Sequence, residues 1–106
     1  MASIEEFKKI ELIVAQIKEV KEHPNADRLY LLQVDTGKDL RQVVAGIRKA
    51  YAPEQLLGRR VILVANLEPA VIRGETSNGM LLAASDANSM ALLMPDKEMS
   101  LGSIVK

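Results

Sequence analysis

R-G-E-T-S-N-G-M-L-L-A-A-S, residues 73–85, is the stretch that decides the fold, because a polar turn leads directly into an apolar run. Gly74 and Gly79 can each adopt a positive φ at little cost, and only small or polar residues separate them. This spacing predicts that Ser77 lies at the tip of an exposed loop. Met80 follows at the start of a strand, where a flexible thioether is suited to contact an irregular ligand, although methionine is more often core filler. The stretch therefore predicts a site without naming its ligand.

The length and composition of the chain describe a small folded protein. Its 106 residues allow one domain, residues 1–106, with a single modest core. A hydrophobic fraction of 48% excludes a disordered chain. Only Phe7, Tyr30 and Tyr51 are aromatic, so we expect a core of Leu, Ile, Val, Ala and Met.

The chain contains no cysteine and a single histidine, His23. Neither a disulfide framework nor a thiolate or histidine-rich metal site can be built from these residues, so we expect no metal and no cofactor. No apolar run reaches the length that spans a bilayer, and Glu5 and Glu6 stand where a signal peptide would carry lysines and leucines. These features predict a soluble, cytoplasmic protein.

Charge is balanced overall, with 14 basic and 14 acidic residues, which weakens any nucleic-acid interpretation because phosphate binding needs local positive charge. Residues 23–60 are nevertheless mildly basic, with seven Lys or Arg against four acids. A solvated face explains this excess as well as a nucleic-acid partner does. The seven are Arg28, Lys38, Arg41, Arg48, Lys49, Arg59 and Arg60.

The N-terminal third predicts a short helix followed by a strand. Ser3 and Glu6 stand at capping-box spacing, so we expect a helix that begins near Ile4 and buries Phe7. Apolar residues also recur at helical spacing over residues 12–20, but the density of Ile and Val there favours a strand. The H-P-N-A-D sequence after it predicts a turn with His23 at the surface.

Short strands and frequent turns fill the remainder. We expect a hairpin from residues 29–34 and 41–45 around D-T-G-K, a helical turn opened by Pro53 and ended by Gly58, and strands at 61–65, 80–84 and 90–94. Pro69 excludes a central strand between residues 66 and 70. This pattern predicts an all-β fold, a small closed barrel with short helices.

Six motifs, in this order, closely resemble the tRNA-binding domain family. They are A-D-R-L (26–29), D-T-G (35–37), R-Q-V-V-A-G-I (41–47), G-x-x-V (58–61), A-N-L (65–67) and R-G-x-x-S-x-G-M-L-L (73–82). That family includes the C-terminal domain or free beta subunit of methionyl-tRNA synthetase and a free-standing tRNA-binding protein. The resemblance covers residues 4–106 and implies an OB-fold, a five-stranded Greek-key barrel, that forms homodimers in chains this short.

The same resemblance implies which residues meet tRNA, although a solvated surface is the alternative for each arginine. Arginines would bind phosphates, Ser77 and Asn66 would bind sugar or phosphate oxygens, and Met80 would contact an exposed base or ribose. With so few aromatic residues, we expect recognition of shape and backbone with little sequence readout, by an accessory domain that serves a synthetase without doing chemistry. The implied residues are Arg28, Arg41, Asn66, Arg73, Ser77 and Met80.

Three alternatives remain. D-T-G at residues 35–37 resembles the active-site motif of a homodimeric aspartic protease, but the charged Lys38 and Asp39 that follow disfavour a buried catalytic loop. A triad of Ser77, His23 and Asp86 lacks a nucleophile elbow. A dimeric export-related chaperone family shares the barrel and binds unfolded polypeptide, and it resembles this chain less around residues 77–80.

Overall fold

Strand β1, Leu12–Glu22, is the centre of the sheet in the computed structural model, which describes residues 1–106. Its first half pairs antiparallel with β4 (Arg60–Val64) and with the short β10 (Ile104–Val105), and its second half pairs with β2 (Tyr30–Asp35). The register shifts between Ile17 and Glu19, which bends the strand. The predicted strand over residues 12–20 is confirmed and runs two residues further.

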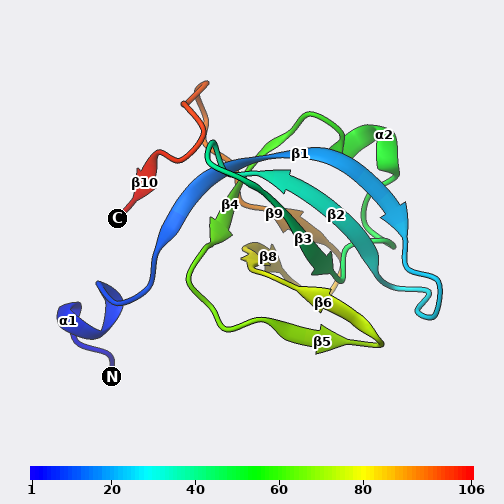
Figure 1. The fold of residues 1–106 in the computed structure, drawn as a ribbon, viewed down its shortest axis with the longest axis horizontal. Helices are drawn as coiled ribbons and strands as arrows, with labels where there is room; N and C mark the ends of the chain where they lie inside the picture. The colour runs from blue at the N-terminus through cyan, green and yellow to red at the C-terminus, as the bar shows by residue number, and fades with distance from the viewer.

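The sheet curls until its edges meet (Figure 1). Strand β3 (Leu40–Ala45) pairs with β2, and β7 (Met80–Leu81) pairs with β4, which gives the order β3-β2-β1-β4-β7. The segment between β6 (Glu75–Ser77) and β7 then reaches back to β3, where Asn78 N donates to Gln42 O at 2.8 Å. The predicted all-β class and curled OB-type barrel are confirmed.

Aliphatic side chains fill the barrel, as the composition predicts. Residues on β2 alternate between buried and half-buried positions, the pattern of a strand with one face on the core. Helix α2 (Pro53–Leu56) packs against β1 and buries Leu56 completely. Each such fully buried side chain contributes about 1.5–3 kcal/mol of transfer free energy. The largest fully buried side chains are Ile17, Leu32, Leu56, Leu63, Val34, Val43 and Val61.

A second apolar cluster lies outside the barrel. Leu12, Val14, Ile62 and Val64 are buried on the opposite face of β1 and β4 from the main core. The C-terminal segment covers them, because Gly102 N donates to Val14 O and Val14 N donates to Ser103 O. Both faces of β1 and β4 are therefore apolar, which is unusual for a small antiparallel sheet.

Helix α1 (Ile4–Phe7) has the predicted capping box: Ser3 Oγ accepts from Glu6 N, and Glu6 Oε1 accepts from Ser3 N. The prediction that it buries Phe7 is wrong, since Phe7 is 43% exposed and no residue of α1 is buried. Figure 1 gives the reason: α1 extends away from the barrel, which therefore does not cover it.

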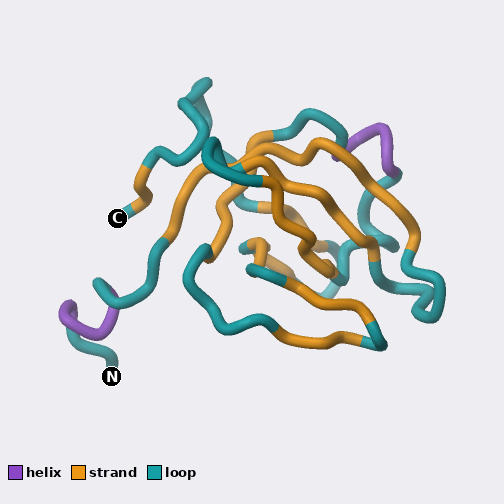
Figure 2. The backbone as a smooth tube through the Cα atoms, viewed as in Figure 1, coloured by secondary structure: helices purple, strands orange, loops and turns teal.

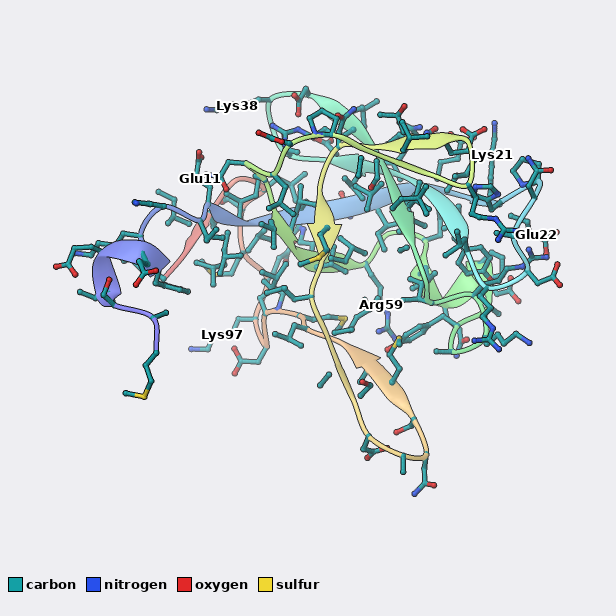
Figure 3. The ribbon with its side chains drawn as sticks, turned by 90° about the horizontal axis from the view of Figure 1, so that it is seen from below. Glu11, Lys21, Glu22, Lys38, Arg59 and Lys97 are labelled. Atoms are coloured by element: carbon teal, nitrogen blue, oxygen red, sulfur yellow. The ribbon has the colours of Figure 1, made fainter.

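Two small hairpins differ from the sequence prediction. The polar stretch from residue 70 to 77 forms β5 (Ala70–Ile72) paired with β6, rather than an irregular loop. The apolar run 80–84 divides into β7 and β8 (Ala83–Ser85), and β8 pairs with β9 (Met90–Leu92). Figure 3 shows the β8–β9 hairpin projecting from the barrel. No helix is long and apolar enough to cross a bilayer.

Candidate nucleic-acid interface

Two connections meet at one end of the β2–β3 hairpin. The first is residues 23–29, the loop between β1 and β2, and the second is the turn of the β5–β6 hairpin, which lies between β4 and β7. Figure 2 shows the loop and the hairpin turn at the same side of the barrel. In OB-fold barrels, the loop between the first two strands and the loop before the last strand are those that bind oligonucleotides.

His23 connects these two segments. The prediction of a surface histidine is wrong: His23 is 3% exposed because the β5–β6 hairpin covers it. Its Nδ1 accepts from Asn25 N at 3.0 Å, and its Nε2 lies 3.2 Å from Ile72 O. Since Nδ1 accepts, the ring carries its proton on Nε2 and donates it to the Ile72 carbonyl.

Arg73 makes the second connection. Arg73 has φ 54° and Gly74 has φ 90°, the pair of positive values that a two-residue hairpin turn between Ile72 and Glu75 requires. A non-glycine residue costs about 1–2 kcal/mol in this conformation. Its Nη2 donates to Asn25 O at 3.0 Å, so the long side chain lies across the first loop. We call the group His23, Asn25, Ile72 and Arg73 the clasp.

Further arginines surround the first loop. The Arg28 side chain is exposed, with no hydrogen bond or ion pair to the protein. Arg48 supports the loop from its other side, because its Nη1 donates to Ala26 O at 3.3 Å and its Nη2 lies 2.9 Å from Glu22 Oε2. Arg28 and Arg73, both predicted to bind tRNA, thus lie on joined loops. Arg48 lies beside them, although the sequence marks it only as one of the seven basic residues of 23–60.

Arg41 and Asn66 lie at the opposite end of the β2–β3 hairpin, where both are used in internal contacts. Arg41 Nη1 donates to Ala65 O at 2.6 Å, and its Nε lies 3.4 Å from Asp39 Oδ1. Asn66 binds the N-terminal segment, accepting from Glu11 N at 2.8 Å and donating to Lys9 O at 2.7 Å. Their contact with tRNA stays a prediction, and the structure does not place them beside the clasp.

Ser77 is not at the tip of an exposed loop. It is 3% exposed at the end of β6, where its Oγ accepts from Val44 N at 2.9 Å and donates to Gly79 O at 3.0 Å. The hydroxyl therefore joins the closing segment to β3. The expected positive φ of Gly79 is confirmed at 146°, and an added Cβ would lie 2.8 Å from Leu63 Cδ1.

Met80 does reach the surface, being 47% exposed. It borders a cavity of about 340 Å³ between β3, β7 and β9. Nine of the ten residues around this cavity are hydrophobic, which suits an apolar group of a ligand. Met80 and Ser77, three positions apart in the motif, therefore face different environments.

Two carboxylates near Arg41, those of Asp35 and Asp39, are held in the turn of the β2–β3 hairpin. The Thr36 hydroxyl, which donates to Asp39 Oδ1 at 2.6 Å, is the main cause that holds the pKa of Asp39 below its ordinary value; desolvation opposes it, and the charge of the nearby Arg41 adds to the lowering. Asp35 Oδ1 accepts from Gly37 N at 2.8 Å, the geometry of a turn. The structure contains no cluster of three or more His, Asp or Glu side chains that could hold a metal ion.

Comparison with known proteins gives relatives over almost the whole chain. The chain is 58% identical over 102 residues to the methionine–tRNA ligase of Pyrococcus horikoshii and 44% identical over 101 residues to that of Caldanaerobacter subterraneus. These matches cover 96% and 95% of this chain but only 14% and 16% of the ligases.

Two solved structures have the same fold. A protein described as related to methionyl-tRNA synthetase from Pyrococcus horikoshii superposes with a TM-score of 0.93 at 31% identity, covering 100% of this chain and 98% of that one. The chaperone CsaA from Picrophilus torridus superposes with a TM-score of 0.92 at 28% identity, covering both chains completely. The family model described as a putative tRNA-binding domain matches residues 12–104, and the chain therefore belongs to that tRNA-binding domain family.

Proposed function

We propose that this chain binds tRNA through the clasp end of the barrel, as a non-catalytic accessory domain or subunit that supports aminoacylation by methionyl-tRNA synthetase in the cytoplasm. The observation that carries the proposal is the convergence of Arg28 and Arg73 on two loops joined by hydrogen bonds. Two guanidinium groups carried on joined loops can contact neighbouring backbone phosphates at once, each with several donors.

The surface supports recognition of folded RNA by shape and backbone. Tyr30 is buried and donates its hydroxyl proton to Tyr51 O at 2.7 Å, while the Tyr51 hydroxyl accepts from Leu92 N at 3.0 Å. Phe7 lies on α1, away from the clasp. No aromatic side chain is left to stack bases beside the arginines, and stacking is how OB-folds hold unstructured strands.

A competition experiment tests this proposal. We expect several different tRNAs to bind with similar, roughly micromolar affinity, about −8 kcal/mol, because only a few phosphate contacts are available to a neutral chain. Unstructured RNA of equal length should compete poorly in a filter-binding assay. Equal competition by the unstructured RNA would contradict recognition by shape.

We also propose that the chain forms a homodimer through the apolar surface around α1 and β10. Phe7, Ile10 and Ile104 are exposed there, beside the second apolar cluster on the outer face of β1 and β4. Their side chains border a cavity of about 240 Å³ that six hydrophobic residues line. A second copy is the occupant that fits, because its own chain buries no residue of α1 and a two-fold axis would cover both apolar surfaces at once.

Light scattering tests the dimer and should return twice the chain mass of 11.6 kDa. Ile104→Glu should give the monomer, since Ile104 is 77% exposed and its replacement disturbs no core. Val71→Glu is the matched control, because Val71 on β5 is 72% exposed but distant from α1 and should leave the dimer intact. A dimer in both variants would exclude this interface.

A chaperone function is the second candidate, favoured by one observation. The cavity beside Met80 and Met90 is lined by nine hydrophobic residues, and methionine-rich surfaces suit varied apolar side chains of a polypeptide. Binding of a reduced, unfolded protein in competition with tRNA distinguishes the two functions. Tighter binding of the unfolded protein than of tRNA would favour the chaperone.

A further inference from the structure

We infer that His23 is a positioning residue for RNA binding, which fixes the separation of Arg28 and Arg73 by joining the loops that carry them. This inference rests on the proposed function and names a determinant of it. His23 touches neither the solvent nor any RNA on the surface, because it is 3% exposed. It acts through the two arginines.

The two ring nitrogens of His23 have different tasks. Nδ1 accepts from Asn25 N two residues away, so this bond shapes the first loop alone. Nε2 donates to Ile72 O, 49 residues away in the sequence, so this bond joins the loop to the β5–β6 hairpin. Of the two ring bonds, only the second joins the two loops.

The fixed separation matters because neither loop is otherwise firmly tied to the other. The remaining direct hydrogen bond between them is Arg73 Nη2 to Asn25 O, made by an exposed guanidinium that RNA would also attract. Gln42 Nε2 ties the hairpin to β3 by donating to Thr76 O at 2.9 Å, but when Arg73 turns toward a phosphate, the His23–Ile72 bond is the direct hydrogen bond that still joins the hairpin to the first loop. An arginine held in place loses less conformational entropy on binding than one on a free loop.

Two conservative substitutions separate the two bonds. His23→Gln keeps a donor at the position of Nε2 and can still bind Ile72 O, but it loses the acceptor for Asn25 N. His23→Asn keeps an acceptor at the position of Nδ1 and loses the bond to Ile72 O. Both remove the imidazole, so they disturb packing to a similar degree, and a merely structural role predicts similar effects on binding.

The inference predicts that they differ. His23→Asn should bind tRNA about fivefold more weakly than the parent, the equivalent of one hydrogen bond, whereas His23→Gln should stay within about twofold. Removal of Arg28 should cost the parent more affinity than it costs His23→Asn, because the unjoined loops no longer present the two arginines together. Circular dichroism at the assay temperature confirms that each variant is folded.

A distance measurement made without RNA distinguishes failure of this inference from failure of the proposed function. The chain has no cysteine, so Asp27→Cys with Thr76→Cys places spin labels only on the first loop and on β6 of the hairpin. His23→Asn should broaden the distribution of distances between the labels, and His23→Gln should not. Equal binding and equal distances in the two variants, or additive effects of His23→Asn and Arg28→Ala, would overturn the inference. A parent protein that binds no tRNA, with distances that change as expected, would overturn the proposed function alone.

Discussion

Residues 77–79 and residues 23–29 are both short polar segments between strands, yet they occupy opposite environments. In the first, Ser77 is buried and Gly79 packs against Leu63, so the segment closes the barrel. In the second, His23 is buried but Arg28 extends into solvent. We therefore expect substitutions in residues 77–79 to lower the free energy of unfolding. Substitutions of exposed residues in 23–29 should instead weaken tRNA binding.

Gly79→Ala should have the largest effect. The new Cβ would lie 2.8 Å from Leu63 Cδ1 and 3.2 Å from Val64 O, at a φ of 146° that other residues rarely adopt. Backbone strain of about 1–3 kcal/mol and overpacking of about 1–3 kcal/mol together predict a loss of about 2–6 kcal/mol. Chemical denaturation measures it. Gly58→Ala is the control, since nothing lies within 4 Å of its Cβ and only φ strain of about 1–2 kcal/mol applies. Equal losses in both would mean that the contact with Leu63 is unimportant.

Ser77→Ala should lower the free energy of unfolding by about 1–3 kcal/mol, because the buried Val44 N–H would have no acceptor. The tRNA affinity of the folded fraction should remain that of the parent. Thr76→Ala, at the exposed neighbouring position, should change stability by less than about 0.5 kcal/mol. A stable Ser77→Ala variant with weak tRNA binding would restore the sequence-based prediction that this hydroxyl contacts RNA.

The sequence predicts local features of both segments well, because local chemistry determines them. The positive φ of Gly74 and Gly79, the capping box at Ser3 and the strand over residues 12–20 all depend on neighbours within a few positions. The environments of Ser77 and His23 do not. Ser77 is buried by Val44, 33 positions away, and His23 by Ile72, 49 positions away. Only the paired barrel brings these residues together.

The resemblance to a family predicts the fold and the arginines better than the composition does, and it leaves the spatial grouping of the site open. Six residues in sequence order gave no means to separate Arg28 and Arg73 from Arg41 and Asn66. The structure separates them by position, because Arg28 and Arg73 lie on the two segments that the clasp joins, whereas Arg41 and Asn66 lie at the opposite end of the β2–β3 hairpin. The short strands β5 and β6 were missed because Glu75, Thr76 and Ser77 carry no hydrophobic alternation.

Arg28→Ala and Arg41→Ala compare a free guanidinium with an occupied one. Arg28→Ala should weaken tRNA binding by about 1 kcal/mol, and it should lower the slope of log affinity against log salt by up to about one unit. Arg41→Ala should change that slope less, since Ala65 O and Asp39 already engage its side chain. Titrations at three salt concentrations measure both. A larger change of slope for Arg41→Ala would move the interface to the opposite end of the hairpin.

The smallest effect concerns the pH dependence of stability near Asp39, which lies beside Arg41. The Thr36 hydroxyl first, and then the charge of Arg41, hold the pKa of Asp39 below its ordinary value of 3.8. Because the pKa is lower in the folded chain than in the unfolded chain, the ionised carboxylate stabilises the fold at pH above 3.8, and this contribution is lost as the pH falls through the lowered value.

Asp39→Asn keeps an oxygen that can accept from Thr36 and removes the charge. The parent should therefore melt slightly above the variant at pH 6, and the difference in melting temperature should shrink as the pH falls below 3.8, and also in high salt because Asp39 is exposed. Asp27→Asn, which removes an exposed carboxylate with no side-chain partner, is the matched control for the loss of one negative charge. A gap between Asp39→Asn and the parent that stays constant from pH 6 to pH 3 would show that the side chain stabilises the turn through its shape and not through its charge.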